Sequence, residues 1–352
     1  MKILFTSHRF FPEVGGIETF SDVFARFLVA RGHEVLLVTQ SQAPSTAEER
    51  SFDFQVLRRP TSSLLLRSYR NTDVVFQNNI ELRSLWPWPI HRVPLVISVQ
   101  TWLRQGERRR TVDILKKFFL HLADHVVCPS EALRKDSCLK SSVIPNPFED
   151  GLFREMPDVD RDSAIVFLGR LVSDKGVDLL IEAFSMLVAD KRLAEECKRQ
   201  GYGLRLGIIG DGPERKALES LVSAKKLGRH VQFFGSLVGN ELVRLLNRHR
   251  VIAIPSRWRE PFGIVALEGM ACGCVPVGSD GGGLRDAIGS AGCVFERGSS
   301  RDLAEKLRAL FLNPDLLKQM RQHTKLHLDV HRSEAVCGKY LDILHELVRG
   351  KR

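Results

Sequence analysis

Residues 1–39 read MKILFTSHRFFPEVGGIETFSDVFARFLVARGHEVLLVT, and they indicate the fold class. Lys2–Thr6 is an unbroken apolar run, typical of a strand that helices cover on both faces. Between residues 17 and 28, apolar side chains recur at the spacing of one helix face. Gly32 is expected to end this helix, because glycine adopts the left-handed conformation that closes helices. The apolar run Glu34–Thr39 follows, so the order strand, helix, strand predicts a parallel α/β sheet.

The same alternation of apolar runs and amphipathic stretches continues along the chain in two series. The first series comprises Lys2–Thr6, Glu34–Thr39, Asp73–Phe76, Pro94–Val99, His125–Cys128 and Val143–Ile144. The second series comprises Ala164–Leu168, Leu204–Ile209, Val231–Phe234, Val251–Ile254 and Val275–Val277. A chain of 352 residues has room for two domains of ~150 residues each. We therefore expect two Rossmann-like domains that face each other across a cleft.

The stretch between the two series has the composition of an interdomain linker, with two prolines followed by acidic and polar residues up to Asp162. We expect an N-terminal domain over residues 1–155 and a C-terminal domain over residues 156–332. A further helical pattern follows over residues 334–348.

The composition, with 43% hydrophobic and 27% charged residues, is that of a globular protein. The first residues turn polar too early for a secretory signal, and no apolar run approaches the ~20 residues of a transmembrane helix. We therefore expect a cytoplasmic protein. Seven cysteines without a CxxC pair predict reduced and mostly buried thiols. The formal charge of +10 favours anionic partners, and the chain lacks nucleic-acid-binding motifs, so we expect a phosphate-bearing substrate and no nucleic acid.

The stretch Glu260–Glu268, EPFGIVALE, follows the apolar run Val251–Ile254 and predicts an anion site. Pro261 suits the first turn of a helix, where backbone N–H groups and the helix dipole attract a diphosphate. The carboxylates of Glu260 and Glu268 can accept hydrogen bonds from sugar or ribose hydroxyls. A capped helix with one exposed acid explains these residues equally well.

Three glycine-containing loops also follow strands, at the sheet edge where parallel sheets bind ligands. Arg170 and Lys175 can clamp a pyrophosphate, although solvated loops commonly carry such residues. The second loop, Gly210-Asp211-Gly212-Pro213, is a weak turn signal by itself. The third loop, Gly15-Gly16, resembles a phosphate loop but lacks the full GxGxxG spacing and a Walker lysine.

In order and spacing, these motifs resemble those of the retaining glycosyltransferases of family 4, also called glycosyl transferases group 1, which have the GT-B fold. The resemblance covers nearly the whole chain. It rests on FFPEVGGIE (10–18), VIPNPFEDGLF (143–153), GRLVSDKGVDLLIEAF (169–184), IIGDGPER (208–215) and the E-x7-E pair of Glu260 and Glu268.

The resemblance implies transfer of a hexosyl group from a UDP- or GDP-linked sugar to an acceptor hydroxyl, with retention of configuration and without a metal or other cofactor. The implied acceptor is a lipid-linked or polysaccharide glycan. The final helix, over residues 333–352, is expected to cross back onto the N-terminal domain. Two alternatives remain open: a catalytically weak sugar-nucleotide-binding protein, and a glycan phosphorylase on a similar scaffold.

The resemblance also implies the roles of individual residues. Arg170 and Lys175 are expected to contact the donor phosphates. Glu260 is expected to hold hydroxyls of the donor sugar, and Glu268 to accept hydrogen bonds from the ribose. The other implied donor-binding positions are Gly16, Gly169, Asp211, Gly212, Phe262, Gly263 and Ile264.

The chain departs from the family pattern at Gln100, which lies where a histidine is usual. Glutamine can hydrogen-bond a sugar hydroxyl, but it cannot exchange a proton near neutral pH. Gln100 is therefore the candidate sugar contact from the N-terminal domain. We retain the prediction of activity because the leaving diphosphate is stabilised electrostatically by cations and helix amides.

Four further patterns have simpler interpretations. Asp158-Val159-Asp160 is formally a DxD motif, but it lies in the linker, so we expect no metal there. His323, His327 and His331 recur every fourth residue and predict an exposed polar helix face rather than a metal site. His8 is either a cleft residue or an ordinary loop residue. Residues 104–117 carry six cations against two acids, which fits contact with an anionic membrane at the inner face and fits a solvated helix face equally well.

Overall fold

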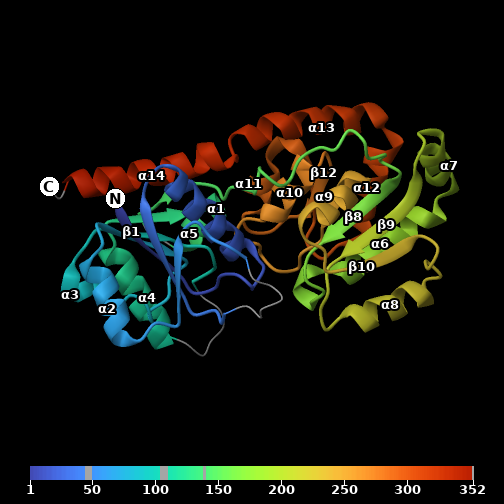
Figure 1. The fold of residues 1–352 in the computed structure, drawn as a ribbon. Helices are drawn as coiled ribbons and strands as arrows, with labels where there is room; N and C mark the ends of the chain where they lie inside the picture. Colours follow the sequence, from blue (N-terminus) through green and yellow to red (C-terminus); the bar gives the residue numbers. More distant parts are fainter. Residues whose placement is uncertain (44–49, 104–109, 138–139, 351–352) are drawn as a thin grey trace. The chain divides into compact units, whose positions relative to one another are not determined.

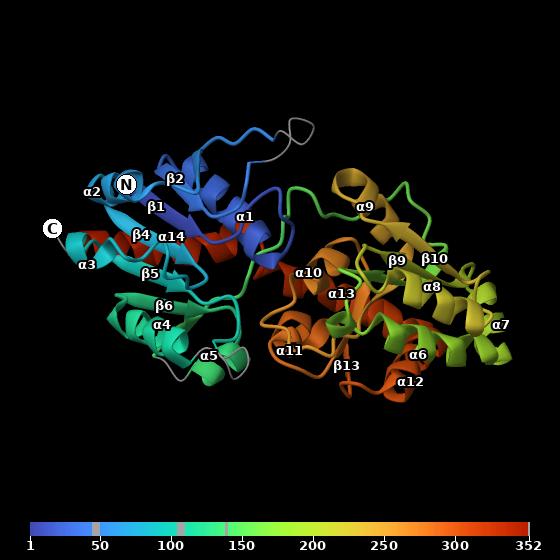
Figure 2. The same ribbon diagram turned by 90° about the horizontal axis from the view of Figure 1, so that it is seen from below.

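The computed structural model describes residues 1–43, 50–103, 110–137 and 140–350, except for the side chain of Arg110. The chain divides into two compact units, which are drawn in Figures 1 and 2. Unit 1 comprises Met1–Phe148 and His331–Arg352, and unit 2 comprises Glu149–Val330. The first segment of unit 1 therefore ends at Phe148, earlier than the boundary expected at residue 155.

Unit 1 is built on a parallel sheet with the strand order β3-β2-β1-β4-β5-β6-β7 in the described residues. Strand β1 is central, and its Ile3 lies opposite Val35 of β2 and Val74 of β4. The elements of this unit are β1 (Lys2–Ser7), α1 (Gly16–Ala30), β2 (Glu34–Thr39), β3 (Gln55–Arg58), α2 (Ser62–Arg70), β4 (Val74–Asn78), α3 (Trp88–His91), β5 (Leu95–Ser98), α4 (Arg110–Leu122), β6 (His125–Cys128), α5 (Glu131–Ser137), β7 (Ser142–Val143) and α14 (Ser333–Gly350).

Helix α14 returns to unit 1 and lies beside α1, as Figure 1 shows and as the resemblance implied. Its Tyr340 is fully buried against aromatic rings from both the sheet and α1. The ring centroids of Tyr340 and Phe24 are 5.3 Å apart, and those of Phe24 and Phe76 are 4.9 Å apart. The last helix is therefore part of the core that covers one face of the first sheet.

Unit 2 is built on a second parallel sheet, with the order β10-β9-β8-β11-β12-β13 in the described residues. Its elements are β8 (Ser163–Leu168), the 3-10 turn η2 (Ser173–Lys175), α6 (Val177–Ala189), α7 (Lys191–Arg199), β9 (Gly203–Ile209), α8 (Arg215–Ala224), β10 (Val231–Gly235), α9 (Gly239–Asn247), β11 (His249–Ile254), α10 (Ile264–Ala271), β12 (Val275–Ser279), α11 (Leu284–Ile288), η3 (Gly289–Ala291), β13 (Cys293–Phe295), α12 (Ser300–Leu312) and α13 (Pro314–Asp329).

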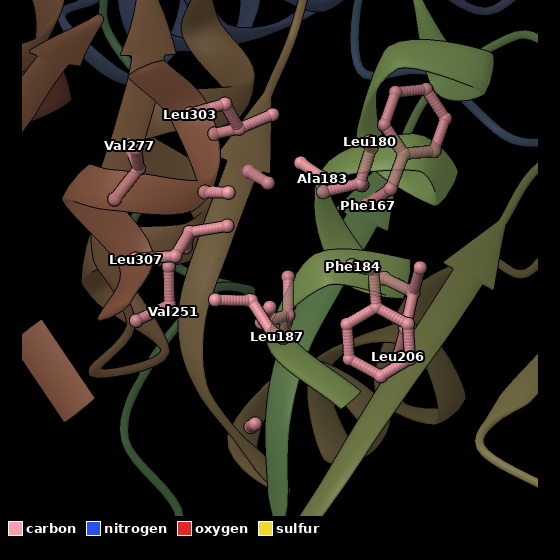
Figure 3. Packing of buried hydrophobic residues seen from close by; sticks show 14 of the residues in the cluster. Phe167, Leu180, Ala183, Phe184, Leu187, Leu206, Val251, Val277, Leu303 and Leu307 are labelled. Carbon is pink, nitrogen blue, oxygen red and sulfur yellow. The ribbon is translucent and has the colours of Figure 1, made fainter. Parts of the chain in front are cut away.

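Figure 3 shows the core on one face of this second sheet, where α6 packs against α12. Phe184 and Leu187 of α6 and Leu307 of α12 are completely or almost completely buried. Each such side chain contributes about 1.5–3 kcal/mol on burial. This packing fixes the positions of the strands, and therefore of the loops that follow them.

Each apolar run expected from the sequence coincides with a parallel strand, which confirms the predicted α/β class. Two short strands at the edges of the sheets, β3 (Gln55–Arg58) and β13 (Cys293–Phe295), are not among the predicted apolar runs. An edge strand has one neighbouring strand and less cover, so it does not need a continuous apolar run. Neither edge strand therefore has the unbroken apolar run that identifies the central strands in the sequence.

Two helix ends behave as expected and one does not. Gly32 and Gly273 have φ angles of 80° and 78°, the left-handed values that close a helix. Gly228 was expected to do the same, but there Lys226 has the positive φ angle, 57°. The helix before β10 therefore ends earlier than the glycine suggested.

The described cysteines are free thiols, and all are buried except the half-buried Cys293, which confirms the expectation for this part of the chain. Cys138 lies outside the described residues. Within the described ranges, no helix is long and apolar enough to cross a membrane.

Candidate functional site

The strand order of unit 2 reverses between β8 and β11. Chain connections leave these two strands in opposite directions, so the loops that follow them leave room for a ligand at the carboxyl edge. The loop after β8 contains Arg170 and Lys175, and the loop after β11 contains Glu260. The topology therefore places three of the predicted site residues at this switch point.

Glycines allow the loops at this edge to approach closely. Gly176 has a φ angle of 65°, and a Cβ atom there would lie 2.1 Å from the carbonyl oxygen of Pro255. A Cβ atom at Gly212 would lie 2.4 Å from the carbonyl oxygen of Leu171. Any larger residue would therefore force the loops after β8, β9 and β11 apart.

Asp211 lies in the loop after β9, and its carboxylate bonds locally. Its Oδ1 accepts a hydrogen bond from the N–H of Gly212 at 2.7 Å, and its Oδ2 lies 3.3 Å from Nη1 of Arg215. Its carbonyl oxygen accepts the N–H of Leu171 at 2.9 Å. Within the described residues, Asp211 and Gly212 therefore shape the loop that supports Gly169 and Arg170.

Lys175 and Glu260 form an ion pair across the switch point. Nζ of Lys175 lies 2.6 Å from Oε1 of Glu260, and the hydroxyl of Ser256 donates to the same oxygen at 2.7 Å. The Glu260 side chain is 12% exposed and that of Lys175 is 27% exposed, so the pair is largely shielded but open on one side. The N–H of Gly283 donates to the carbonyl oxygen of Glu260 at 2.7 Å, which fixes this position to the loop after β12.

Arg170 has a different environment from Lys175. Its side chain is exposed and forms no ion pair or hydrogen bond with another described residue. Since the guanidinium group is not committed within the described chain, it can bind an anionic ligand without breaking an existing contact.

Helix α10 begins at Ile264, so the expectation that Pro261 lies in its first turn was wrong. The residue before the helix, Gly263, has a φ angle of 109°, which helical backbone does not allow. A Cβ atom at Gly263 would also lie 2.6 Å from Cδ1 of Leu284, so the loop needs glycine there. Among the described residues no side chain caps this helix, so N–H groups of its first turn are available to bind an anion. Phe262 is buried and anchors the loop.

Glu268 lies one turn inside α10 and is half-buried. Burial, with a smaller contribution from the negative charge of Glu149, raises its pKa to about 7. No described side chain forms an ion pair or hydrogen bond with its carboxyl group. Its oxygens can therefore accept hydrogen bonds from ligand hydroxyls.

In unit 1, Gly16 is the first residue of α1 and is exposed. The amide nitrogen of Asn78, at the end of β4, donates to the carbonyl oxygen of Ile17 at 2.9 Å and to the hydroxyl of Ser21 at 2.7 Å. The strand order of this sheet reverses between β1 and β4. The start of α1 is therefore fixed at the switch point of the first sheet.

The side chain of Gln100 points into the interior of unit 1. Its amide is paired reciprocally with that of Asn146, with N···O distances of 3.1 and 2.8 Å. Its Nε2 also donates to the hydroxyl of Ser98 at 2.8 Å, which lies 3.2 Å from the hydroxyl of Tyr340. Only 6% of Gln100 is exposed. Both ends of its amide are therefore engaged in a buried network that joins β5 to the linker and to α14.

Ser256 and Glu81 are not among the site residues predicted from the sequence, which left the role of His8 open. Ser256 lies two residues after the end of β11, and its hydroxyl donates to Glu260. Nδ1 of His8 lies 3.8 Å from Oε2 of Glu81, and these residues follow β1 and β4. The signal was present in all three cases, since each polar residue follows a buried parallel strand.

The histidine series does not form the expected exposed face. Nε2 of His327 lies 2.8 Å from the carbonyl oxygen of Ala287, and burial lowers its pKa. His331 is buried and lies beyond the end of α13. Asp158 of the DxD motif is paired with Arg244 at 3.0 Å. Among the described residues, no group of three or more potential metal ligands occurs.

Two family models match the chain in tandem. The model described as "Glycosyltransferase Family 4" matches residues 14–150, and the model described as "Glycosyl transferases group 1" matches residues 152–327.

Curated relatives with similar sequences are glycosyltransferases. The phosphatidylinositol N-acetylglucosaminyltransferase gpi3 subunit of Schizosaccharomyces pombe is 26% identical, over 86% of this chain and 71% of its own length. A GDP-mannose-dependent monoacylated alpha-(1-6)-phosphatidylinositol monomannoside mannosyltransferase of Corynebacterium glutamicum is 24% identical, over 97% of this chain and 96% of its own. The alignment with the alpha-D-kanosaminyltransferase of Streptomyces kanamyceticus spans only 42% of that protein.

The fold also matches solved structures of low sequence identity. Anabaena Alr3699/HepE, solved in complex with UDP and glucose, has a TM-score of 0.80 and 19% identity, with 98% of this chain and 100% of that chain covered. Sucrose-phosphate synthase from Thermosynechococcus elongatus has a TM-score of 0.80 and 20% identity, with 99% of each chain covered. The two parallel-sheet units and the two family models agree: the chain is a glycosyltransferase with the GT-B fold and belongs to the glycosyl transferases group 1 family.

Proposed function

We propose that this glycosyltransferase moves a hexosyl group from a UDP- or GDP-linked sugar to a hydroxyl of a lipid-linked or polysaccharide glycan, with retention of configuration. The observation that carries the proposal is the Lys175–Glu260 pair at the switch point of the second sheet, beside the uncapped start of α10. A cation, a carboxylate and free helix N–H groups together suit a diphosphate joined to a sugar.

The proposed step breaks the bond between the anomeric carbon and the diphosphate oxygen and forms a bond from that carbon to the acceptor oxygen. The proton of the acceptor hydroxyl passes to the departing phosphate oxygen, so no separate base and no metal are required. Arg170, Lys175 and the N–H groups at Gly263 and Ile264 stabilise the negative charge that develops on the diphosphate.

The two carboxylates have separate roles in this proposal. Glu260 binds hydroxyls of the transferred sugar, and Ser256 and Lys175 hold its carboxylate in position. Glu268 accepts hydrogen bonds from the ribose, because its carboxyl group has no partner among the described side chains. Gly16 allows the donor phosphate to approach the backbone at the start of α1.

The acceptor class is proposed from the names of the relatives. Two of them act, by name, on phosphatidylinositol-linked substrates, and both align with most of this chain. A glycan on a lipid carrier combines a sugar hydroxyl with a membrane location, so we place the protein in the cytoplasm at the inner face of the membrane.

The reaction is tested by incubating the protein with a panel of UDP- and GDP-sugars and measuring nucleotide release with and without lipid-linked and soluble glycan acceptors. Release with one donor, lost in Glu260→Ala, is the expected result. Donor binding in calorimetry without transfer would instead favour a sugar-nucleotide-binding protein, and sugar phosphate formed from glycan and inorganic phosphate would favour a phosphorylase.

Helix α4 supports the proposed membrane contact. Its outward face is apolar: Ile114, Leu115 and Phe118 are 66%, 45% and 55% exposed. These residues lie three and four positions apart, so they form one stripe on the helix surface. Figures 1 and 2 both place α4 on the outside of unit 1. The cation-rich sequence of residues 104–117 overlaps this helix, which suits an anionic lipid surface, although residues 104–109 lie outside the described structure.

Vesicle sedimentation tests this contact, with vesicles of phosphatidylglycerol and phosphatidylcholine compared with phosphatidylcholine alone. We expect binding to the anionic vesicles, weakened about tenfold or more in the double variant Ile114→Ser, Phe118→Ser. Leu326→Ser is the matched control, because Leu326 is 72% exposed on α13 of unit 2. The proposal would be contradicted if the double variant bound anionic vesicles as well as the wild-type protein does. It would also be contradicted if the two substitutions abolished self-association of the protein and left vesicle binding unchanged.

A further inference from the structure

His8 and Glu81 occupy the two loops at the switch point of the first sheet. β1 and β4 are hydrogen-bonded neighbours, with Ser7 opposite Asn78 at their carboxyl ends. His8 directly follows Ser7, and Glu81 lies three residues beyond Asn78. Connections diverge at such a point, and ligands of parallel sheets bind there.

The structure holds Glu81 firmly and leaves His8 accessible. The Glu81 side chain is 12% exposed, and its Oε1 accepts the N–H of Ser84 at 3.1 Å. Its carbonyl oxygen accepts Nε2 of Gln77 at 3.0 Å. Burial works to raise the pKa of Glu81, but the nearby imidazole of His8 and the hydrogen bond from Ser84 outweigh burial and lower it. Glu81 is therefore a fixed anion at the switch point.

The imidazole of His8 points one nitrogen at this anion. Its Nδ1 lies 3.8 Å from Oε2 of Glu81, and 48% of the side chain is exposed. The carbonyl oxygen of His8 accepts the N–H of Gln40 at 3.2 Å and lies 3.3 Å from the Thr39 hydroxyl, which fixes the backbone of this residue. In the neutral imidazole, a carboxylate that faces Nδ1 favours the tautomer with its proton on Nδ1, which leaves Nε2 as an acceptor.

The same topological position carries the donor-side pair in the other unit. Lys175 follows β8 and Glu260 follows β11, the two strands at the switch point of the second sheet. In each unit, then, a buried carboxylate from one central loop orients a basic side chain from the other. The second pair is part of the proposed chemistry, and the first has the same arrangement.

We propose that Nε2 of His8 accepts a hydrogen bond from a hydroxyl of the acceptor sugar next to the one that attacks, with Glu81 as the positioning residue that orients the imidazole. This assignment rests on the proposed transferase function and names the group that meets the acceptor. The attacking hydroxyl passes its own proton to the departing phosphate oxygen, and His8 takes no part in that transfer. The hydrogen bond to the neighbouring hydroxyl orients the acceptor, so that its attacking oxygen is aligned with the anomeric carbon.

Gln100 does not compete for this task. Its amide is committed at both ends to Asn146 and Ser98, so it cannot offer a free acceptor without breaking buried hydrogen bonds. His8 is exposed, carboxylate-oriented and attached to the central strand.

The experiment separates acceptor use from donor chemistry by measuring nucleotide release from the best donor of the panel, first in water alone and then with a series of alkyl glycosides. For His8→Ala we expect release with the glycosides to fall about ten- to a hundredfold, and hydrolysis in water to stay within about twofold. Glu81→Gln should cause a smaller fall, in the same direction. The double variant should be no worse than His8→Ala, because Glu81 acts through His8.

Arg9→Gln is the matched control, since Arg9 pairs with Glu13 at 3.4 Å in the same loop and should leave both rates unchanged. A second measurement follows the Cε1–H resonance of His8, assigned by its loss in His8→Gln, as the glycosides are added to donor-loaded protein. A shift of this resonance supports the proposal. It is overturned if no glycoside shifts the resonance, or if the two release rates fall equally in His8→Ala. Failure of the wild-type protein to release nucleotide from any donor would count against the proposed function itself.

Discussion

Lys175 and Glu260, 85 positions apart in the sequence, lie within 2.6 Å of each other because their loops follow the two central strands of the second sheet. We expect Glu260→Ala and Lys175→Ala each to lower kcat/KM for transfer by about a hundredfold or more, since both contact the reacting group in the proposed mechanism. The measurement is the rate of nucleotide release from the best donor of the UDP- and GDP-sugar panel in the presence of an acceptor.

Arg257→Gln is the control for these variants. Arg257 pairs with Asp178 at 2.6 Å, and its backbone N–H donates to Asp174 at 2.8 Å, so it lies between the same two loops but outside the proposed contacts. Its substitution should change kcat/KM by less than about threefold, since exposed ion pairs contribute little. A loss as large as that of Glu260→Ala would mean that loop rigidity, and not the named side chains, limits the rate.

Close packing of the donor-side loops predicts a stability effect at Gly176. Alanine there would combine a positive φ angle with a Cβ atom 2.1 Å from the carbonyl oxygen of Pro255, and should destabilise the fold by about 2–4 kcal/mol. Gly228→Ala, with no heavy atom within 4 Å of the added carbon, should be nearly neutral. Urea unfolding of the two variants measures the difference, and equal midpoints would refute the packing argument.

The raised pKa of Glu268 predicts a pH effect on stability. Its carboxyl group has a pKa of about 7 in the folded chain, against an ordinary value of 4.5. Above pH 7 the group is charged in both states, so burial of the charge weakens the fold; below pH 4.5 it is protonated in both, and that cost is absent. Relative to Glu268→Gln, the wild-type melting temperature should therefore rise as pH falls from 8 to 5.5. A constant difference between the two proteins would contradict the shifted pKa.

The proposed ribose contact of Glu268 can be tested with modified nucleotides. The wild-type protein should bind the nucleoside diphosphate of its donor about tenfold or more tightly than the 2′-deoxy form, because the deoxy form lacks one hydrogen-bond donor to the carboxylate. Calorimetry on Glu268→Gln should show a smaller preference. If wild-type protein binds both nucleotides equally, the ribose 2′-hydroxyl does not reach Glu268.

The buried amide pair predicts a structural role for Gln100. In Gln100→Ala both polar atoms of the Asn146 side chain would lose their partner, at a cost of about 1–3 kcal/mol of folding free energy. The donor KM should change little. A raised donor KM with unchanged stability would instead support Gln100 as a sugar contact.

The sequence predicted the central strands because they are buried on both faces, which requires unbroken apolar runs such as Val251–Ile254. It could not locate the start of α10, because Pro261 is a favourable first-turn residue and only the positive φ angle of Gly263 delays the helix. The edge strand Gln55–Arg58 was missed for the opposite reason, since partial cover permits a mixed composition.

Candidate site residues were recognisable where they lie in loops after strands, as Lys175 and Glu260 do. Which loops lie close together depends on the order of the strands in the sheet, and this order cannot be predicted from the apolar runs of the sequence alone. Gln100 shows the same limit. Its orientation is decided by Asn146 of the linker and by Ser98, and that network forms only when the linker folds against the sheet.

Tyr340 and its neighbours on α14 complete the aromatic core around Phe24 and Phe76, although the whole of unit 2 precedes them in the chain. During translation, the first 148 residues leave the ribosome long before this helix exists. Residues 149–330 can form their own core as they leave the ribosome. Residues 1–148 keep one face of their sheet partly uncovered until α14 has been synthesised. A stop codon shortly before residue 333 would therefore damage the earliest-made part of the protein and spare the part made immediately before the break.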